Sequence, residues 1–373
     1  MKNIAIVSNT SWYVYNFRKG FLSELIRLGY NVFVVSPKDK FIKEIEEIGC
    51  VFIELKKIKN KGKNPLQEML LTLELIKNFK KNKIDFALFY TPKINIFGSI
   101  ATKFSKTKGI ATINGLGFVF NEGQSKFLQK IVRSLYGFAF SGLPAIFFQN
   151  EDDKEFFIQS KIIRSKQQVY VVKGSGVNLT EFYQKTNFSP SVPITFLLSA
   201  RLIKEKGINE YFEAAKIVKH KYPNTNFALL GVKADNPSAI PIETVKKLNA
   251  EGIIDYWGSS DNMSATFDKV DVMVLPSYYR EGIPKVLIEA LSKGLPLITT
   301  NNVGCKETVD DGKNGYLIPV KNIDALVVAM EKIINLSPEQ RLQMGNYSRQ
   351  KAVAEFDEKE NHQQYINVIK KIG

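Results

Sequence analysis

Short apolar runs alternate with helix-like segments along the whole chain, and this alternation limits the possible folds more than any other feature. In the first half, apolar runs at 3–8, 31–37 and 85–91 are separated by segments at 15–30 and 65–83, in which apolar residues recur with helical spacing. A strand, a helix and a strand at short intervals predict a parallel sheet that is covered by helices on both faces.

The same pattern begins again in the second half of the chain. Strands are expected at 193–200, 226–231, 270–277 and 295–301, with helices at 208–223 and directly after Ser277. Since 373 residues are enough for two such units, we predict an α/β protein of two Rossmann-like domains that face each other across a cleft. We place these domains at 1–178 and 179–354. One last helix, from about residue 338 to the C-terminus, is expected to pack back on the first domain through residues 355–373.

The composition narrows the choice of partners. The net charge of +15 points to an anionic partner, which could be nucleic acid, an acidic bilayer or a phosphorylated small molecule. We find no RNA- or DNA-binding motif, and the lysines are not interleaved with aromatic stacking platforms, so nucleic acid is not an expected partner. A basic nucleic-acid-binding protein stays open as the rival class.

The few cysteines and histidines of the chain argue against a disulfide framework and a histidine zinc site. Cys50 and Cys305 are far apart in sequence and give no disulfide framework, and His220 and His362 are too few for a histidine zinc site. We therefore expect no histidine-based zinc site and a cytoplasmic location. No secretory signal is evident, and no run approaches the roughly 20 apolar residues of a spanning helix. The protein is expected to touch a membrane without crossing it.

The stretch "YYREGIPKVLIEALSKGLP" at 278–296 has the features of a phosphate site. Pro284 suits the first turn of a helix, where its missing N–H has no consequence. The free N–H groups at a helix start attract phosphate through their donors and the helix dipole, and a glycine there lets a ligand approach the backbone. The residues expected at this helix start are Gly282, Ile283, Pro284, Lys285 and Val286.

Two carboxylates flank that helix start. Glu281 comes just before it, and Glu289 lies five residues after Pro284, about 7.5 Å along the helix, with a side chain that leans back toward the N-terminus. Carboxylates on both sides of a phosphate site suit a nucleotide sugar, which has a ribose on one side of its diphosphate and a hexose on the other. On spacing alone, two ordinary surface charges remain an equal alternative.

Two cations are expected at the same edge of the second sheet. Arg201 follows the strand at 193–200, and Lys206 precedes a helix that begins near Gly207. Ligands of open α/β sheets bind at the carboxyl ends of the strands. An arginine binds a diphosphate with two parallel hydrogen bonds, and a lysine adds a point charge. The alternative is a pair of solvated surface cations.

The motifs of the second half, taken together, resemble a known family. "RLIKEKG" at 201–207, followed by "EGIPKVLIEAL" at 281–291, is similar to the retaining glycosyltransferases of family 4, which have the GT-B fold. "GCKETVDDGKNGYLIPV" at 304–320 and "GSGVNLTEF" at 174–182 also look like that family. The resemblance covers nearly all of the second domain. It implies a hexosyltransferase that uses a nucleotide-sugar donor and needs no metal or other cofactor.

The resemblance also implies individual roles. Arg201 and Lys206 would bind the donor diphosphate, Glu281 would contact the donor sugar, and Glu289 would contact the ribose. The backbone that would meet the base belongs to Trp257, Gly258 and Ser259.

The first half resembles enzymes that build bacterial lipid-linked oligosaccharides, through "SNTSWYVYNFRKGF" at 8–21 and "TINGLGFVF" at 112–120. This resemblance implies a UDP-N-acetylhexosamine donor, with N-acetylgalactosamine expected, and an undecaprenyl-diphosphate-linked sugar as acceptor. The product would serve protein N-glycosylation on the inner face of the cytoplasmic membrane. Lipopolysaccharide or capsule synthesis is the alternative within the family, and a nucleotide-sugar epimerase would need a partner base that we do not find. The candidate acceptor residues here are Asn9, Thr10, Asn16 and Arg18.

Two departures from the family pattern concern the first domain. Many members have a Gly-Gly loop after the first strand, where this chain has Ser8-Asn9-Thr10-Ser11, and many have a histidine where this chain has Asn114. Asn114 can orient a hydroxyl or a sugar, so we group it with Arg201, Lys206 and Glu281 as catalytic candidates. A turn residue before Gly115 is the alternative for Asn114. With no nucleophilic carboxylate evident, retention is expected to proceed by front-face attack.

A basic and partly apolar surface is expected on the first domain. Nine lysines lie between Lys56 and Lys83, and Lys126, Lys130 and Arg133 recur on one side of a helix rich in Phe, Leu and Ile. Cations beside apolar side chains suit the interface of an anionic bilayer. A helix that faces the core and has a solvated polar edge is the alternative.

Overall fold

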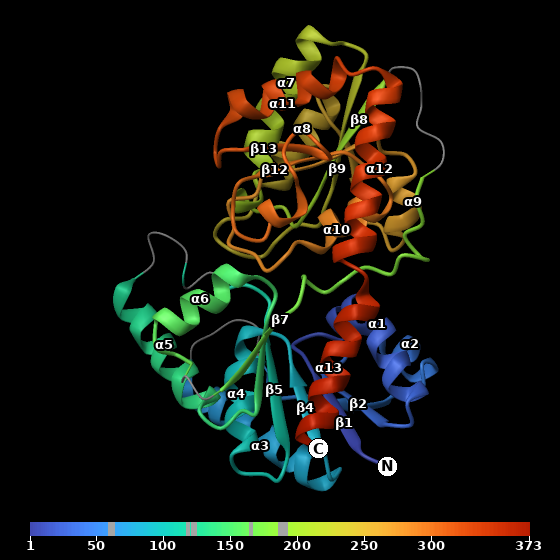
Figure 1. Ribbon diagram of the computed structural model, residues 1–373. Coiled ribbons are helices and arrows are strands. Elements are labelled where there is room, and N and C mark those ends of the chain that lie inside the picture. Colours follow the sequence, from blue (N-terminus) through green and yellow to red (C-terminus); the bar gives the residue numbers. More distant parts are fainter. Residues whose placement is uncertain (59–63, 117–119, 121–124, 164–166, 186–192) are drawn as a thin grey trace. The chain divides into compact units, whose positions relative to one another are not determined.

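The computed structural model describes residues 1–58, 64–116, 120, 125–163, 167–185 and 193–373 (Figure 1). The chain divides into two compact units. Unit 1 consists of Met1–Ser175 and Glu358–Gly373, and unit 2 consists of Gly176–Asp357. Each unit is built on a parallel sheet, which confirms the predicted α/β class with two Rossmann-like domains.

The sheet of unit 1 has the strand order β3-β2-β1-β4-β5-β6-β7, and neighbouring strands are parallel. Its central strands are buried on both faces, which explains why they are continuous apolar runs in the sequence. The strands are β1 (Asn3–Val7), β2 (Asn31–Ser36), β3 (Val51–Glu54), β4 (Phe86–Phe89), β5 (Lys108–Ile113), β6 (Ala145–Phe148) and β7 (Gln168–Val171). The helices are α1 (Ser11–Arg27), α2 (Ile42–Glu47), α3 (Pro65–Lys81), α4 (Pro92–Thr102), α5 (Lys126–Phe140), α6 (Glu151–Gln159) and α13 (Glu358–Ile372).

The sheet of unit 2 has the order β10-β9-β8-β11-β12-β13 and is also parallel. Its strands are β8 (Ile194–Ser199), β9 (Thr225–Leu230), β10 (Asp255–Gly258), β11 (Val272–Leu275), β12 (Leu297–Thr300) and β13 (Gly315–Ile318). Its helices are α7 (Ile208–Lys221), α8 (Ile242–Ala250), α9 (Met263–Phe267), α10 (Lys285–Ser292), α11 (Ile323–Ile334) and α12 (Pro338–Glu355), with short 3-10 turns η2 (Lys204–Lys206) and η3 (Lys306–Thr308).

Both sheets have a point where the strand order reverses. It lies between β1 and β4 in unit 1 and between β8 and β11 in unit 2. Ligands of open α/β sheets bind beside the carboxyl ends of the strands at such a point. In unit 1 these strand ends lead into Ser8 and Tyr90, and in unit 2 they lead into Ala200 and Pro276.

The expected single helix from residue 338 to the C-terminus is wrong, because two helices occupy this stretch. Helix α12 ends at Glu355, and Phe356 leaves helical geometry (φ −124°, ψ 13°) with its ring fully buried in the core of unit 2. Helix α13 then packs in unit 1, where the Tyr365 ring stacks on Phe147 with centroids 4.1 Å apart. The chain changes units at residue 357, because the buried Phe356 ring fixes the end of α12 to one core and Tyr365 fixes α13 to the other.

The first helix begins earlier than predicted. Helix α1 starts at Ser11, not near residue 15, because Thr10 caps it by accepting a hydrogen bond from the Tyr13 N–H at 3.1 Å. The expected loop Ser8–Ser11 is therefore shortened by its last residue, and the aromatic residues Trp12 and Tyr13 belong to the first turn of α1.

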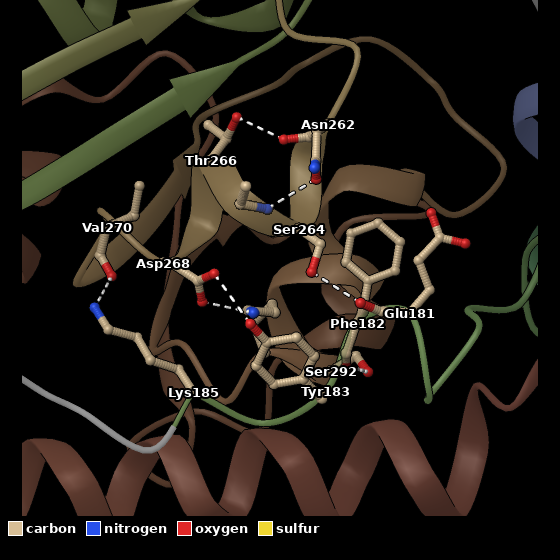
Figure 2. A network of polar contacts seen from close by, with 12 residues as sticks. Glu181, Phe182, Tyr183, Lys185, Asn262, Ser264, Thr266, Asp268, Val270 and Ser292 are labelled. Carbon is tan, nitrogen blue, oxygen red and sulfur yellow. Dashed lines mark hydrogen bonds and ion pairs between the residues drawn. The ribbon is translucent and has the colours of Figure 1, made fainter.

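The segment that enters unit 2 is held by a network of polar contacts (Figure 2). The Tyr183 hydroxyl donates to Asp268 at 3.3 Å, and the fully buried Lys293 ammonium lies 2.6 Å from the same carboxylate and over the Tyr183 ring. The Ser264 hydroxyl donates to the Glu181 carbonyl at 2.8 Å. Residues 181–185 are therefore fixed on unit 2, and the backbone position of Glu181 is fixed with them.

Candidate active site

Two loops of unit 2 bring the sequence motifs together. The carbonyl oxygen of Glu205, in turn η2 after β8, accepts hydrogen bonds from the N–H groups of Tyr278 (2.9 Å) and Tyr279 (3.0 Å), which follow β11. The Ser277 hydroxyl donates to the same carbonyl at 3.2 Å. Because β8 and β11 are neighbours in a parallel sheet, this contact joins both loops at the carboxyl edge, as the sequence predicts.

Lys206 and Glu281 form an ion pair between these loops, and both side chains are mostly buried. The Ser277 hydroxyl oxygen lies 3.1 Å from the same Glu281 oxygen, so its single proton is shared between that carboxylate and the Glu205 carbonyl. Gly207 makes this approach possible, since its φ is +74° and a Cβ there would lie 2.2 Å from the carbonyl oxygen of Pro276. The sequence predicts both residues at one site but does not predict that they pair with each other.

Arg201 lies at the exposed rim of the same edge. Burial raises the pKa of Tyr279, and Arg201, which hydrogen-bonds its hydroxyl, opposes that rise. Lys206 lies over the same ring, with its ammonium 5.8 Å from the centroid. Tyr279 therefore contacts both predicted diphosphate cations. Tyr279 belongs to the stretch at 278–296, but no role for it could be predicted, because its position between the cations depends on the Glu205 contact.

The helix start differs slightly from the prediction. Helix α10 begins at Lys285, so Pro284 is its N-cap residue (φ −61°, ψ 119°) and not a residue of the first turn. The N–H groups of Lys285 and Val286 precede the first intrahelical bond, in which Leu287 N–H donates to the Pro284 carbonyl at 3.0 Å. They remain candidate phosphate donors.

The remaining residues of this loop serve the core and the backbone. The Ile283 side chain packs in the core of unit 2. The carbonyl oxygen of Gly282 lies against Gly304, where a Cβ would come within 1.9 Å of it at a φ of +87°. Gly304 belongs to the motif at 304–320, so this motif packs directly against the backbone of the Gly282 loop.

Glu289 is a buried carboxylate on α10 with an unusual pKa. Its carboxylate lies 3.7 Å from the Lys285 ammonium. Burial raises the pKa of Glu289 to about 7, Lys285 acts against that rise, and the charge of Glu181 adds to it. Glu181 is a residue that the sequence analysis missed, because only the network in Figure 2 fixes it near α10. A group that is half-ionised near neutral pH suits hydrogen bonding to a hydroxyl-bearing ligand.

The predicted base-binding backbone lies at the end of strand β10, at the edge of the sheet. The Gly258 carbonyl accepts a hydrogen bond from Gly231 N–H at 2.7 Å, and Gly258 has a φ of +67°. The Trp257 indole donates to Asp255 at 2.6 Å, and Ser259 is exposed. The β10 segment therefore ends at the same carboxyl edge as the two loops above.

Asn114 follows β5 in unit 1 and is half-buried. Its amide nitrogen donates to the Tyr13 hydroxyl oxygen at 2.6 Å and to the Tyr90 carbonyl at 2.6 Å. Its Oδ1 is buried and has no hydrogen-bond partner among the described residues. The alternative of a simple turn residue does not account for these contacts.

Arg18 is a buried cation in unit 1 beside Asn114. Its side chain is 2% exposed, its Nη2 donates to the Tyr13 hydroxyl oxygen at 3.2 Å, and its guanidinium lies 4.0 Å from the centroid of the Tyr90 ring. Burial alone would lower the pKa of Arg18, but the surrounding tyrosines, including Tyr365, hold it above the usual value. Among the described residues, no carboxylate forms an ion pair with Arg18.

The other candidate acceptor residues lie at the start of α1. Thr10 is used as the helix cap, Asn9 is half-buried, and the Asn16 amide donates to the Trp12 carbonyl at 2.9 Å. The Trp12 side chain is exposed. The structure therefore gives Thr10 a structural role and leaves the roles of Asn9 and Asn16 as expectations.

Helix α5 exposes both cations and apolar side chains. Lys126 and Lys130 are exposed, and Phe127 between them is 75% exposed. Arg133 differs from the two lysines, because it is half-buried and its guanidinium lies 5.3 Å from the Phe156 ring. The predicted basic stripe therefore has two surface members and one that packs against α6.

Helix α3 exposes an apolar face that the sequence analysis missed. Leu71, Leu75 and Phe79 point into the core, as a helix on a sheet requires. A second apolar row lies on the solvent side with helical spacing, and it consists of Leu66, Met69, Leu70 and Leu73. The signal was present as a second set of i, i+3, i+4 and i+7 positions. Lys59, Lys61 and Lys63, which belong to the predicted lysine cluster, lie outside the described residues.

Neither a metal site nor a membrane-spanning helix is found among the described residues. In the described part of the chain, no group of three or more His, Cys, Asp or Glu side chains is placed to hold a metal ion. None of the helices in the same part is long and apolar enough to cross a membrane.

Known protein families match both halves of the chain. A family described as glycosyl transferase 4-like matches residues 3–150, and a family described as glycosyl transferases group 1 matches residues 180–351. The chain is 27% identical over 385 residues to the N,N'-diacetylbacillosaminyl-diphospho-undecaprenol alpha-1,3-N-acetylgalactosaminyltransferase of Campylobacter jejuni, covering 99% of this chain and 98% of that one. It is 24% identical over 288 residues to the UDP-Gal:alpha-D-GlcNAc-diphosphoundecaprenol alpha-1,3-galactosyltransferase of Escherichia coli, covering 73% of each chain.

Solved structures show the same fold. The structure of HepE from Anabaena in complex with UDP-glucose aligns with a TM-score of 0.81 at 14% identity and covers 100% of both chains. The structural neighbours are GT-B glycosyltransferases, which confirms the predicted fold class. With a glycosyl transferase 4-like domain followed by a glycosyl transferases group 1 domain, the chain belongs to the GT-B glycosyltransferases and is a hexosyltransferase.

Proposed function

We propose that this hexosyltransferase moves N-acetylgalactosamine from its UDP-activated form to an undecaprenyl-diphosphate-linked sugar, with retention, during oligosaccharide assembly for protein N-glycosylation. The observation that carries the proposal is the joining of two motifs in unit 2, where the Lys206–Glu281 pair lies beside the start of α10. The choice of sugar and acceptor is supported by the full-length similarity to the Campylobacter enzyme.

The donor roles follow from the charges at the unit 2 edge. Arg201 and Lys206 bind the diphosphate together with the N–H groups of Lys285 and Val286, and Tyr279 holds the two cations at a fixed spacing. A bound diphosphate takes over part of the Lys206 charge that Glu281 neutralises in the ligand-free protein. The Glu281 carboxylate is then available to accept a hydrogen bond from a hexose hydroxyl.

Glu289 and the end of β10 hold the nucleoside in this proposal. The Glu289 carboxylate accepts hydrogen bonds from the ribose hydroxyls, and ligand binding favours its ionised form because hydrogen bonds to a charged group stabilise the charge. The backbone of Trp257, Gly258 and Ser259 meets the base at the sheet edge.

The reaction step is a displacement at the anomeric carbon. The acceptor hydroxyl oxygen forms a bond to that carbon on the face from which the diphosphate oxygen leaves, and the hydroxyl proton passes to the departing diphosphate oxygen. Arg201, Lys206 and the helix start stabilise the negative charge that develops on the diphosphate, which is commonly a large part of such a rate enhancement. The proposal requires no metal and no other cofactor.

Unit 1 holds the acceptor and contacts the membrane in this proposal. Exposed apolar side chains on α5 and α3, with Lys126 and Lys130 beside Phe127, are supporting features, because cations next to apolar groups favour an anionic interface. The protein is proposed to bind peripherally to the inner face of the cytoplasmic membrane, with no nucleic acid partner.

A second donor is favoured by one specific observation. The similarity to the Escherichia coli galactosyltransferase, whose name also gives a diphosphoundecaprenol acceptor, makes UDP-galactose a competing donor. The wider alternative is a transferase of lipopolysaccharide or capsule synthesis, supported by 24% identity over 327 residues to a capsular polysaccharide glycosyltransferase of Staphylococcus aureus.

The experiment is a donor and acceptor screen. Radiolabelled UDP-N-acetylgalactosamine, UDP-N-acetylglucosamine and UDP-galactose are each incubated with undecaprenyl-diphosphate-linked mono- and disaccharides, and the labelled lipid is extracted. We expect transfer from UDP-N-acetylgalactosamine to an N-acetylated acceptor, with an α-linked product by NMR. Preferred transfer from UDP-galactose would move the protein to the second candidate, and a β-linked product would contradict retention.

A further inference from the structure

The carboxyl edge of the unit 1 sheet contains a hydrogen-bonding pair that is incomplete. The Asn114 amide nitrogen lies 2.6 Å from the Tyr90 carbonyl oxygen and 2.6 Å from the Tyr13 hydroxyl oxygen. A carbonyl oxygen can only accept hydrogen bonds, so the Tyr90 contact fixes the amide with its nitrogen on this side. The Oδ1 of Asn114 therefore faces the other way, where it is buried and has no donor among the described residues.

Among the described residues, the Tyr13 hydroxyl lacks an acceptor for its proton, whereas Asn114 Oδ1 lacks a donor. Its oxygen accepts two hydrogen bonds, one from Arg18 at 3.2 Å and one from Asn114 at 2.6 Å, and a phenol oxygen has no capacity for a third. Its own proton must then be donated elsewhere, and no described residue accepts it. The two N–H donors, one of them charged, also withdraw electron density from the oxygen, which makes the remaining O–H a stronger donor.

One additional oxygen can satisfy both groups. The nitrogen and oxygen of an amide lie about 2.3 Å apart by standard bond dimensions. Since Asn114 Nδ2 is 2.6 Å from the Tyr13 oxygen, Asn114 Oδ1 lies within about 5 Å of that oxygen. Hydrogen bonds between oxygens are about 2.7–2.8 Å long, so the separation of these two atoms is within the span that one bridging oxygen covers. The pair offers one donor and one acceptor, which is what an alcohol hydroxyl needs.

The surroundings hold this pair rigidly. The Tyr13 ring stacks on Phe17 with centroids 4.8 Å apart, and the Arg18 guanidinium is fixed between Tyr13 and the Tyr90 ring. Arg18 is buried without an ion-pair partner among the described residues, a costly arrangement unless its charge is used. Its charge acts on the one oxygen that Asn114 also contacts.

We propose that Tyr13 and Asn114 bind the acceptor hydroxyl that receives the sugar, and that Arg18 is a positioning residue that acts through Tyr13. The hydroxyl donates to Asn114 Oδ1 and accepts from the Tyr13 O–H, which leaves the second lone pair of its oxygen for the bond to the anomeric carbon. An amide oxygen is too weakly basic to take the proton, which still passes to the departing diphosphate oxygen. This inference rests on the proposed function, because it assumes an alcohol acceptor.

The test uses a deoxy acceptor. The product of the wild-type protein identifies which hydroxyl is glycosylated, and an acceptor analogue in which hydrogen replaces that hydroxyl is then compared with the acceptor as a competitive inhibitor and in direct binding. We expect the wild type to bind the acceptor roughly tenfold more tightly than the deoxy analogue, a loss typical of a hydroxyl that leaves buried polar groups unpaired. Tyr13→Phe keeps the ring, and its affinities for the acceptor and for the deoxy analogue should differ by no more than about twofold.

The matched control is Tyr15→Phe. Tyr15 is on the same helix, is also half-buried and stacks on Phe41, away from Asn114. It should keep the wild-type preference. A Tyr13→Phe variant that still binds the acceptor about tenfold more tightly than the deoxy analogue would overturn the proposal. The acceptor hydroxyl would then not be bound by Tyr13.

A double-mutant cycle tests whether the two residues share one hydroxyl. Tyr13→Phe and Asn114→Ala should each lower acceptor kcat/KM roughly tenfold, and the double variant should lose well under the hundredfold expected of independent sites. Losses that multiply would contradict a shared hydroxyl. UDP affinity should stay unchanged in all three variants, because the donor residues belong to unit 2.

The role of Arg18 is tested through Tyr13. Arg18→Lys keeps the charge but changes the fork geometry, and we expect it to lower the preference for the acceptor over the deoxy analogue roughly threefold. In the Tyr13→Phe background the same change should have no effect on that preference, although it still lowers thermal stability. An equal effect in both backgrounds would show that Arg18 is structural. If Arg18→Lys does not fold, the Tyr13→Phe comparison decides the proposal by itself.

The outcomes separate this inference from the proposed function. If the wild type transfers no sugar to any lipid-linked acceptor and binds no UDP-sugar, the proposed function fails. If transfer proceeds and Tyr13→Phe retains the wild-type preference, the proposed function stands and the inference fails.

Discussion

The two sheets of this protein have the same parallel plan, but their carboxyl edges carry different chemistry. In unit 2 the edge carries opposite charges that neutralise each other, Lys206 with Glu281 and Lys285 with Glu289. In unit 1 it carries neutral hydrogen-bonding groups around one buried cation, Arg18, which has no ion-pair partner among the described residues.

This difference matches what two kinds of ligand require. A leaving diphosphate gains charge during the reaction, so it needs cations that can exchange one anionic partner for another. An alcohol stays neutral until late, so it needs one donor and one acceptor at fixed positions. A shared fold therefore does not determine the ligand, and the side chains at the strand ends do.

Removing the Arg201 cation from the charged edge of unit 2 should change activity more than any other substitution considered. Arg201→Ala should lower turnover on the order of 100-fold or more, because it removes a charge that stabilises the leaving diphosphate. Inhibition by UDP should weaken as well. Steady-state kinetics with the best donor of the screen measure both effects. Lys204→Ala is the matched control, because Lys204 is an exposed cation on the adjoining turn η2. Near-normal kinetics of Arg201→Ala would mean that Arg201 does not bind the diphosphate.

The next effect concerns the surface of unit 1. Lys126→Glu combined with Lys130→Glu should weaken binding to anionic liposomes by at least about 30-fold, since each cation near such a surface contributes about 1 kcal/mol. Arg133 is left in place because it packs on Phe156. Turnover on a short water-soluble acceptor should change little, and turnover on the long-chain acceptor in membranes should collapse.

The matched control for the membrane variant carries the same charge change elsewhere. Lys246→Glu with Lys247→Glu alters two exposed lysines on α8 of unit 2 and should leave liposome binding within about threefold. If both double variants lose binding equally, net charge and not the α5 surface controls the partitioning. If neither does, the membrane contact lies elsewhere, and the apolar row on α3 becomes the first place to test.

A tenfold effect should separate the two glutamates of unit 2. Glu289→Ala should weaken both UDP and donor binding, because its carboxylate contacts the ribose in the proposal. Glu281→Ala should lower transfer while UDP affinity stays close to that of the wild type, because its contact is with the hexose. Calorimetric titration with UDP gives the comparison, and an equal loss of affinity in both variants contradicts this division of roles.

The raised pKa of Glu289 should make donor affinity depend on pH, by a factor similar to or smaller than about tenfold. With a pKa of about 7, the carboxyl is mostly protonated at pH 6 and mostly ionised at pH 8. If the donor binds the ionised form, affinity for a UDP-sugar should rise up to about tenfold over this range. A UDP-sugar is preferred to UDP because its diphosphate does not titrate here. Glu289→Gln should flatten the profile, and a rise that persists in this variant would assign it to another group.

The smallest effect concerns the stability of unit 1. Burial, with a contribution from the Arg18 charge, lowers the pKa of His362 to about 3. A histidine whose pKa is lowered in the folded state stabilises the fold above its unfolded pKa of about 6.5, and this contribution falls as the pH drops below that value. Unfolding free energy should therefore fall by about 1 kcal/mol between pH 6.5 and pH 5.5. Denaturant titrations of the wild type and of His362→Gln measure it, and an equal fall in both would exclude His362 as the cause.

The fold and the donor edge could be predicted from the sequence for a physical reason. Parallel strands buried on both faces must be continuous apolar runs, and the parallel topology puts their carboxyl ends at one edge. Arg201, Lys206 and Glu281 could therefore be placed together before any contact was known.

The parts that could not be predicted depend on contacts between distant residues. Tyr13 and Asn114 are about one hundred positions apart, and only the folded sheet brings them to 2.6 Å. Glu181 approaches α10 because a network of contacts fixes its segment. The break between α12 and α13 follows from Phe356 being buried in one core, which has no signature in the local sequence.

We propose that unit 2 binds the donor and unit 1 binds the acceptor. This assignment is tested by the pair of Michaelis constants, for donor and for acceptor, in Glu289→Ala and in Tyr13→Phe. We expect Glu289→Ala to raise the donor constant about tenfold at an unchanged acceptor constant, and Tyr13→Phe to do the reverse. If either variant raises both constants equally, or if the two effects are exchanged, the assignment of the ligands to the units is wrong.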